Sequence, residues 1–179
     1  SETLDLAKSG AVAGLCPVTE ANLGDGIFNG LEYFQNQGMF GLGTDSNINI
    51  SLIEEIKTFE YSQRLNNKKR AVISNQKKSS GRIIFDQSLA GGSRALQINN
   101  GKIENGYCAD LLSLRIDNLE LDGLVGDKIL DYFIFASKGN LINRVWKKGK
   151  CLVNDGKHID CELISSKYQK TIRKLKNLL

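Results

Sequence analysis

Short apolar runs alternate with amphipathic stretches along roughly the first third of the chain. The runs at 11–15 and 39–43 have the length of buried strands. Between them, Ile27, Leu31 and Phe34 have the spacing of one helical face, and a glycine at position 38 ends that helix. This order of helices and strands is typical of a parallel sheet covered on both faces. Two strands are too few for a stable parallel sheet, so further strands must come from elsewhere.

The predicted helices of this part begin at recognisable capping residues. Ser1 is placed to cap a short first helix that Gly10 ends. Ser51 and Glu54 have the spacing of a capping box, which predicts a helix from there to about Leu65. We expect one face of this helix to carry Leu52, Ile56 and Phe59 toward the core.

The pattern changes after about residue 100, from helical to alternating. Residues 80–96 predict a helix that is interrupted at Gly91-Gly92. A half-buried strand is predicted where Leu112, Leu114 and Ile116 alternate with polar residues, and a helix is expected near 128–135. The sequence Lys148-Gly149-Lys150 predicts a hairpin turn, and 154–156 a second turn, so we expect a small antiparallel sheet.

The C-terminal tail predicts an amphipathic helix. Apolar residues recur at helical spacing and basic residues occupy the other positions, so we expect the helix to dock on the body of the protein. A helix that lies on a membrane surface is the alternative interpretation. The apolar positions are Ile164, Tyr168, Ile172, Leu175 and Leu179.

Composition excludes several classes of protein. Of 179 residues, 41% are hydrophobic and 25% are charged, which excludes a disordered tail, a coiled coil and a collagen-like fibre. No apolar run is long enough to cross a bilayer, and no secretion signal opens the chain. The net charge of +4 is mild, and the basic clusters are nearly free of aromatic residues. We therefore expect neither a nucleic-acid partner nor a membrane partner.

Cysteine and histidine content limits the chemistry further. The four cysteines form no CxxC pair, which disfavours a zinc knuckle and fits a reducing cytoplasm. Cys16 is expected to be a small core residue rather than a nucleophile. His158 is the one histidine and is expected at the surface, so this chain cannot assemble a histidine-rich metal centre alone. Because the chain starts at Ser1, we expect a processed product or a piece of a longer protein.

The segment 43–47 is the strongest chemical signal in the sequence. Asp45 follows a buried strand directly, at the edge where α/β proteins carry their active sites. A carboxylate there can bind a divalent metal and accept a proton from metal-bound water. An aspartate that caps the next turn is the alternative, and the spacing leaves both interpretations open.

A polar loop is predicted at the same edge, after the first strand. If the two strands are neighbours, the loop over 16–26 and Asp45 border one pocket. The candidates for contacts with a polar substrate are then Glu20, Asn22, Asp25 and Ser46. Spacing alone favours a solvated loop instead.

Several motifs together resemble the formimidoylglutamate deiminases, a family of the amidohydrolase superfamily. The most specific part is the run 19–26, TEANLGDG, which follows SGAVAGLCP at 9–17. The resemblance continues with GTDS at 43–46, EYSQRL at 60–65, AGGSRAL at 90–96 and CADL at 108–111. It therefore spans nearly the whole chain.

The resemblance implies a fold and a division of the chain. Members have a (β/α)8 barrel and a small β-sandwich that both chain ends build. This chain resembles the last two barrel strands with their helices over 1–99, and the C-terminal part of the sandwich with an inserted helix over 100–160. The tail helix over 161–179 completes it.

The resemblance also implies the chemistry. Asp45 matches the aspartate that binds the catalytic Zn²⁺ and moves protons, while the zinc-binding histidines belong to an N-terminal half that this sequence lacks. The implied reaction is hydrolysis of N-formimino-L-glutamate to N-formyl-L-glutamate and ammonia in histidine breakdown. Asn47 departs from the family pattern, where a histidine is frequent.

Three functional hypotheses follow. The first is the C-terminal portion of a zinc-dependent formimidoylglutamate deiminase in the cytoplasm, inactive without its N-terminal half. A second is another amidohydrolase-type deaminase or guanidine hydrolase that uses the same aspartate. The third is a non-catalytic fragment that acts by association, as a homo-oligomer held by exposed strand edges.

Overall fold

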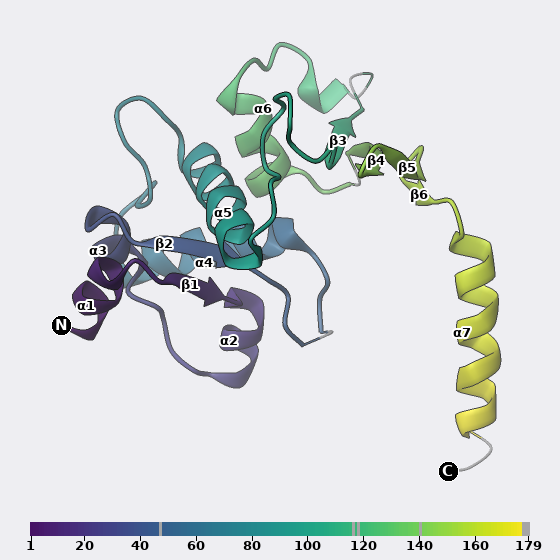
Figure 1. Ribbon diagram of the computed structural model, residues 1–179, viewed down its shortest axis with the longest axis horizontal. Coiled ribbons are helices and arrows are strands. Elements are labelled where there is room, and N and C mark those ends of the chain that lie inside the picture. The colour runs from purple at the N-terminus through teal and green to yellow at the C-terminus, as the bar shows by residue number, and fades with distance from the viewer. Residues whose placement is uncertain (47, 116, 118, 140, 177–179) are drawn as a thin grey trace.

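The chain forms two separate sheets with helices packed around the first (Figure 1). The computed structural model describes residues 1–46, 48–115, 117, 119–139 and 141–176. A two-stranded sheet holds β1 and β2, and a four-stranded sheet has the order β3-β4-β5-β6. The mixed helix and strand content that the sequence predicts is confirmed.

The two strands of the first sheet are parallel, as the sequence predicts. β1 (Val12–Leu15) pairs with β2 (Met39–Leu42) in a register that runs from Val12 opposite Met39 to Leu15 opposite Leu42. The crossover between them contains α2 (Pro17–Leu23) and α3 (Gly30–Gln35), while α1 (Glu2–Ser9) precedes β1. Their carboxyl ends therefore lie side by side.

Two long helices complete the first unit. They are α4 (Leu52–Asn67) and α5 (Ser80–Leu96), and α5 packs along β2. The predicted caps are confirmed, because the Ser1 and Ser51 hydroxyls accept hydrogen bonds from the amides of Leu4 and Glu54. The core between sheet and helices includes Leu15, Tyr33, Phe40, Ile56, Phe59, Ile73, Ile83 and Ile84.

Buried polar groups of α4 hold the surrounding loops. Glu60 is fully buried, and its carboxylate accepts hydrogen bonds from Arg64 Nε at 2.9 Å and from the amides of Val72 and Ile73. Gln63 bonds the carbonyl of Phe28 and the amide of residue 31. The buried polar residues of the 60–65 motif thus form a clamp, by which we mean that their hydrogen bonds hold two neighbouring segments of the chain against α4.

Three local predictions about the first unit are wrong. The 19–26 segment is largely helical, because Pro17 at the first helical position favours a helix start and Gly24, at φ 75°, ends it. The helix α5 continues through Gly91 and Gly92, and the lack of a side chain at Gly91 lets it approach β2 closely. Leu52 is 56% exposed, at the solvent side of the first turn of α4.

The helix predicted around Ile27, Leu31 and Phe34 is shorter than expected. α3 starts only at Gly30, and Ile27 lies before it with 50% of its surface exposed. Gly30 sits so close to Phe59 and Gln63 that any side chain would collide with the Phe59 ring. The close packing of α3 against α4 therefore requires a glycine at the first residue of α3.

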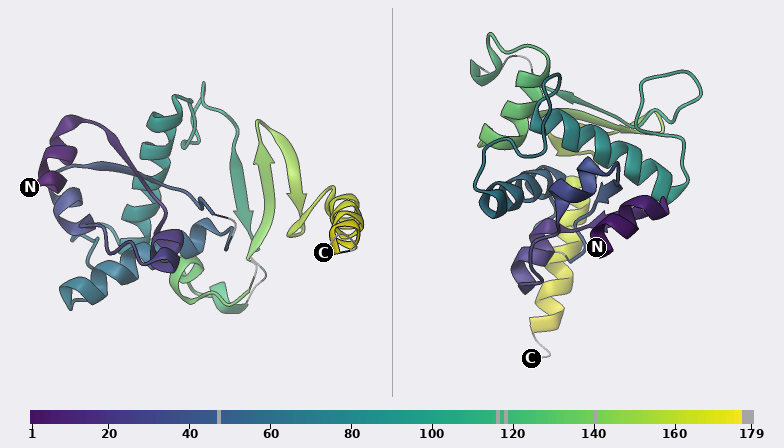
Figure 2. Two further views of the ribbon diagram at one scale, coloured as in Figure 1. Left: turned by 90° about the horizontal axis from the view of Figure 1, so that it is seen from below. Right: turned by 90° about the vertical axis from the view of Figure 1, so that its left-hand side faces the viewer.

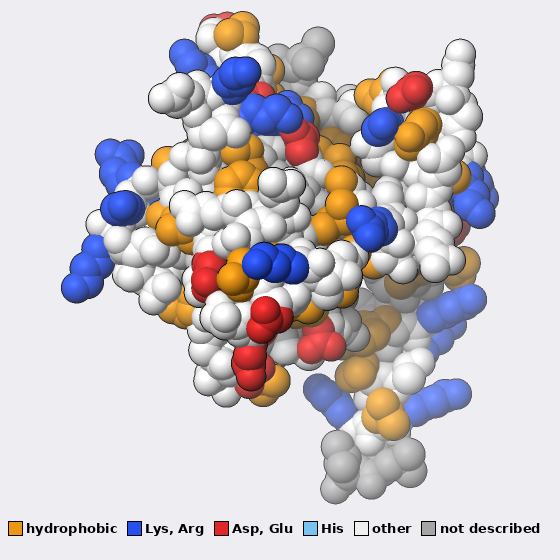
Figure 3. Space-filling view, turned by 60° about the vertical axis from the view of Figure 1, so that its left-hand side comes forward, with side chains coloured by type: hydrophobic (Ala, Val, Ile, Leu, Met, Phe, Trp, Pro, Cys, Tyr) orange, Lys and Arg blue, Asp and Glu red, His pale blue; other side chains and the backbone are white. Residues whose placement is uncertain are grey.

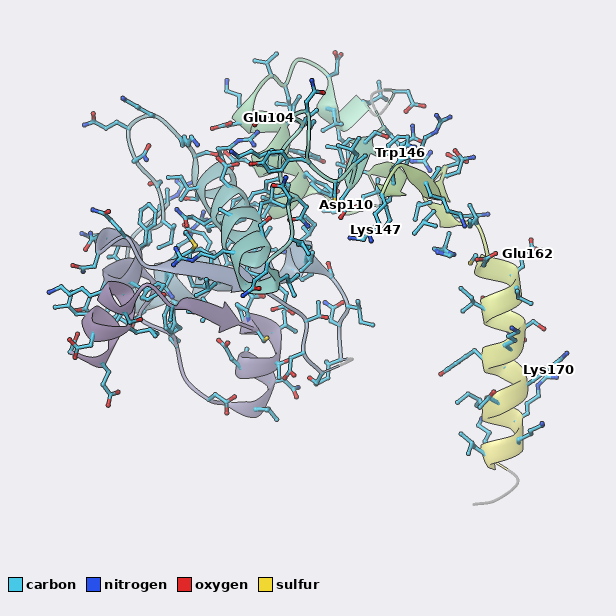
Figure 4. The ribbon with its side chains drawn as sticks, viewed as in Figure 1. Glu104, Asp110, Trp146, Lys147, Glu162 and Lys170 are labelled. Atoms are coloured by element: carbon cyan, nitrogen blue, oxygen red, sulfur yellow. The ribbon has the colours of Figure 1, made fainter. Side chains whose placement is uncertain are left out.

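The second sheet is antiparallel, as predicted. It contains β3 (Leu111–Leu114), β4 (Ile142–Lys147), β5 (Lys150–Asn154) and β6 (Lys157–His158). The hairpin turn is confirmed: Lys148 and Gly149 both have positive φ, the geometry of a type I′ turn. Lys147 of β4 pairs with Asp110, which precedes β3 (Figure 4).

The predicted burial of β3 is only partly right. Leu112 is 46% exposed and Leu114 is half-buried, and the pairing register with β4 shifts between Ser113 and Leu114. Ile116 lies outside the described residues. The expected inserted helix is present as α6 (Asp127–Asp131) and a π-helical turn, η2 (Tyr132–Ala136), after a short 3-10 turn, η1 (Leu119–Leu121).

The C-terminal helix forms as predicted but does not dock. α7 (Cys161–Lys176) projects from β6 and stands apart from the body in Figure 1 and in the left view of Figure 2. Ile164 and Tyr168 are 53% and 66% exposed, so the apolar side of α7 is left uncovered by the rest of the described chain (Figure 3). Leu179 lies outside the described residues. None of the described helices is long and apolar enough to cross a membrane.

Candidate functional site

Asp45 lies just beyond the carboxyl end of β2, at an edge that β1 shares. The Gly43 amide donates to the Leu15 carbonyl at 3.0 Å, so the pairing with β1 continues past the end of β2. The Asp45 side chain is exposed, and its backbone is left-handed with φ 40°. Among the described residues, we find no hydrogen bond to its carboxylate. The carboxylate is therefore accessible to a ligand.

The first turn of α2 faces the segment that carries Asp45. Thr19 is 4% exposed, and its Oγ1 lies 3.0 Å from Ser46 Oγ and 3.4 Å from the Thr44 carbonyl oxygen. Thr19 thus bonds the residue on each side of Asp45. Sequence reasoning placed Thr19 in a solvated loop and missed this role. The signal that points to it is Pro17, which favours a helix start two residues earlier.

Two carboxylates satisfy the amides at the start of α2. Glu20 Oε1 accepts the Cys16 amide at 2.7 Å, and Glu55 Oε2 accepts the Val18 amide at 2.9 Å. Glu55 is fully buried, and its Oε1 has no hydrogen-bond partner among the described residues. Burial raises the pKa of Glu55, the Val18 amide opposes the shift, and the negative charge of Glu20 adds to it.

Acidic side chains lie near the thiol of Cys16. Burial raises its pKa, and the charges of Asp45, Glu20 and Glu55 raise it further, in that order. A raised pKa favours the protonated thiol at neutral pH, which lowers its nucleophilicity. The same clustering of acidic side chains suits a cation.

The structure brings only some of the candidate residues together. Ser46 and Glu20 lie at the edge with Asp45, although the Glu20 carboxylate is engaged with its own helix. Asn22 and Asp25 are exposed, and their side chains form no hydrogen bond with another described residue. A cavity of about 260 Å³ lies between α2, the segment that follows it and α4. Its lining includes Glu20, Phe28 and Phe59.

The described residues do not form a complete metal site. Nowhere in the described part of the chain do three His, Cys, Asp or Glu side chains gather as ion ligands. His158 is exposed on β6, in the second sheet. Asp45 fits one position of a metal site, because its carboxylate is exposed and lies among other acidic groups. Asn47, at the position where the family pattern differs, lies outside the described residues.

A parallel sheet that carries an exposed carboxylate at its carboxyl edge is typical of metal-dependent α/β hydrolases. The model of the amidohydrolase family matches residues 1–152, and the chain belongs to this family.

Two relatives are similar to this chain over most of its length. The formimidoylglutamate deiminase of Pseudomonas aeruginosa is 40% identical over 159 residues, which are 88% of this chain and 35% of that protein. The crystal structure of an amidohydrolase from Brucella melitensis, also 40% identical, superposes with a TM-score of 0.89 over 97% of this chain and 38% of its own. The chain therefore spans little more than a third of the length of these relatives.

A more distant structure shares the fold. An adenosine deaminase from Xanthomonas campestris, solved with bound zinc, is 21% identical and superposes with a TM-score of 0.78. It covers 97% of this chain and 40% of its own length. At this identity the likeness extends to the fold alone.

Proposed function

We propose that this chain is the C-terminal portion of a zinc-dependent formimidoylglutamate deiminase. The complete enzyme hydrolyses N-formimino-L-glutamate to N-formyl-L-glutamate and ammonia. One observation carries the proposal: Asp45 presents an accessible carboxylate at the carboxyl edge of β2, inside the GTDS motif. The 40% identity to the Pseudomonas deiminase over most of the chain supports the choice of substrate.

In this proposal Asp45 supplies one ligand to the metal. When bound, Zn²⁺ would acidify a water molecule and so supply the nucleophile for hydrolysis at neutral pH. The second oxygen of the Asp45 carboxylate takes up a proton and returns it to the departing nitrogen. The remaining metal ligands come from outside this chain, because His158 on β6 is its one histidine.

The same proposal explains the two sheets. β1 and β2 are the last two strands of a (β/α)8 barrel whose part here spans 1–99. The antiparallel sheet belongs to a β-sandwich part over 100–160, and 161–179 is a separate tail helix. The N-terminal half then supplies the strands that flank β1 and β2.

Substrate contacts are proposed at the rim of the same edge. Ser46 is the best placed of the four candidates, because it adjoins Asp45 and its hydroxyl is held by Thr19. Glu20 acts there only if its bond to the Cys16 amide is exchanged for one to substrate. Asn22 and Asp25 are exposed, and a role for them requires a substrate that extends along α2.

A chimera tests the proposal. The part of the Pseudomonas deiminase that aligns with this chain is replaced by this chain, and ammonia release from N-formimino-L-glutamate is measured with zinc. We expect turnover by the chimera and none by the 179-residue chain alone. Asp45→Asn abolishes turnover, whereas Asp5→Asn, a control at an exposed position in α1, leaves it unchanged.

Other outcomes decide between the alternatives. A folded, zinc-loaded chimera that releases ammonia from adenosine but not from N-formimino-L-glutamate identifies a different deaminase. Full turnover by Asp45→Asn contradicts the role of Asp45. Turnover by the chain alone contradicts the need for an N-terminal half. Sedimentation of the chain alone as a stable, specific oligomer favours the associating fragment instead.

A further inference from the structure

The conformation of Asp45 is unusual and needs a cause. Its φ of 40° lies in the left-handed region, which most residues other than glycine rarely adopt, although aspartate adopts it more readily than most. Among the described residues, none bonds its carboxylate, so the direction of the side chain depends on the backbone. Whatever fixes this backbone also fixes the direction of the Cα–Cβ bond, and with it the positions that the carboxylate can reach.

Thr19 contacts the chain on both sides of Asp45. Its Oγ1 lies 3.4 Å from the Thr44 carbonyl oxygen and 3.0 Å from Ser46 Oγ. One hydroxyl has a single proton and two lone pairs, so it can donate to the carbonyl while it accepts from the serine. Two anchors on either side of one residue restrict the φ and ψ angles available between them.

Thr19 is itself held firmly in place. Its side chain is 4% exposed, and it belongs to the first turn of α2. Side chains bind the neighbouring amides. Glu55 Oε2 accepts a hydrogen bond from the Val18 amide, and Glu20 Oε1 accepts one from the Cys16 amide. Glu55 projects from α4 and is fully buried, so the start of α2 is tied to the body of the protein rather than to solvent.

We propose that Thr19 is a positioning residue, whose hydroxyl holds the left-handed backbone of Asp45 and thereby limits the positions that its carboxylate can reach at the edge of the sheet. The use of that carboxylate as a metal ligand rests on the proposed function. The conformational link between Thr19 and Asp45 does not.

A double-mutant cycle on the 179-residue chain tests the link. Thr19→Val removes the hydroxyl and keeps the shape, and Asp45→Gly removes the penalty for positive φ. In the wild-type background, Asp45→Gly leaves the folding equilibrium constant nearly unchanged or raises it, because glycine favours φ 40°. In the Thr19→Val background, Asp45 relaxes to negative φ and glycine then lowers the constant by about fivefold.

Matched variants keep this test specific. Thr19→Ser retains the hydroxyl and restores the wild-type response to Asp45→Gly, even if it loses some stability. Thr58→Val, on α4 and half-buried, shows no coupling to Asp45→Gly. Additive effects of Thr19→Val and Asp45→Gly, or a serine variant that behaves like valine, overturn the proposal.

Zinc affinity of the chimera separates this inference from the proposed function. Thr19→Val weakens zinc binding by about tenfold in a chelator competition, the usual range for residues that orient a metal ligand, and Thr19→Ser restores it. Coupling in the cycle, with a zinc affinity that Asp45→Asn leaves unchanged, upholds the positioning role and refutes Asp45 as a ligand. Absence of coupling overturns the positioning role whatever the zinc affinity.

Discussion

Gly91 of α5 lies directly against the backbone of Phe40 in β2. A β-carbon at position 91 would overlap the Phe40 carbonyl oxygen, whereas one at position 92 would meet no atom within 4 Å. The two adjacent glycines therefore have different roles. Gly91 sets the distance between helix and strand, whereas Gly92 leaves room for a side chain.

This difference predicts opposite effects of the same substitution. Gly91→Ala forces α5 away from β2 and lowers the free energy of unfolding by about 3 kcal/mol. Gly92→Ala adds helix propensity without a collision and raises it by up to about 1 kcal/mol. Urea unfolding followed by circular dichroism measures both. Equal losses for the two variants would contradict the close approach at Gly91.

Glu60 is expected to be essential for stability. Its buried carboxylate binds Arg64, two backbone amides and the Ser80 hydroxyl, so Glu60→Ala leaves all of these donors unsatisfied. We expect a loss of about 3 kcal/mol or more in the free energy of unfolding. Glu54→Ala, one and a half turns earlier and partly exposed, is the control and costs less than about 1 kcal/mol. Similar losses for both variants would argue against the clamp.

Glu55 predicts a pH dependence of stability. Burial raises its folded-state pKa above the ordinary 4.5, so the folded state prefers the protonated acid. The stability that this preference contributes is fully present below pH 4.5 and is lost as the pH rises through the folded-state pKa. Glu55→Gln cannot ionise, so its stability relative to wild type increases from acidic to neutral pH. A difference that stays constant over this range in urea titrations would refute the shift.

Cys16 and Cys161 are expected to differ in reactivity. The raised pKa of Cys16 keeps its thiol protonated at neutral pH, whereas Cys161 is exposed on α7. Iodoacetamide therefore modifies Cys161 first, and modification of Cys16 accelerates as the pH increases. Asp45→Asn removes one of the charges that raise the pKa, so it speeds the reaction of Cys16. Peptide mass spectrometry measures the labelling of both sites. Faster labelling of Cys16 than of Cys161 at neutral pH would contradict the raised pKa of Cys16.

Removal of α7 is expected to leave the body intact. The helix has no extended packing contact with another described element, and its side chains are exposed except for the half-buried Ile172. Truncation after Asp160 therefore changes the free energy of unfolding by less than about 0.5 kcal/mol. Leu141→Ala, at a fully buried position, is the positive control and costs about 2–5 kcal/mol. A loss in the truncated chain comparable to that of the control would indicate a docked helix.

Local signals predicted much of the fold. Ser1 and Ser51 mark helix starts, and the Lys148-Gly149 turn specifies the hairpin, because each depends on residues close in sequence. The errors arise where distant residues decide. The close approach of α5 to β2 at Gly91 involves Phe40, which is distant in sequence, and a helical pattern alone does not reveal whether α7 packs on another element.

The candidate site divides in the same way. Asp45 was predicted because a strand end and an acidic residue are adjacent in sequence. Thr19 and Glu55 were not, because their contacts join residues 19 and 46 and residues 18 and 55. The helix start at Pro17 was the available local signal, and the glycine-rich run after it obscured the helix.

In the first sheet, β1 and β2 have each other as their one paired strand among the described residues. Exposed strand edges recruit other chains during folding, so this segment is vulnerable to aggregation on its own. Ribosomes make proteins from the N-terminus. In the proposed enzyme, the other strands of the barrel have already emerged when these two strands leave the exit tunnel, so their edges are covered as soon as they appear.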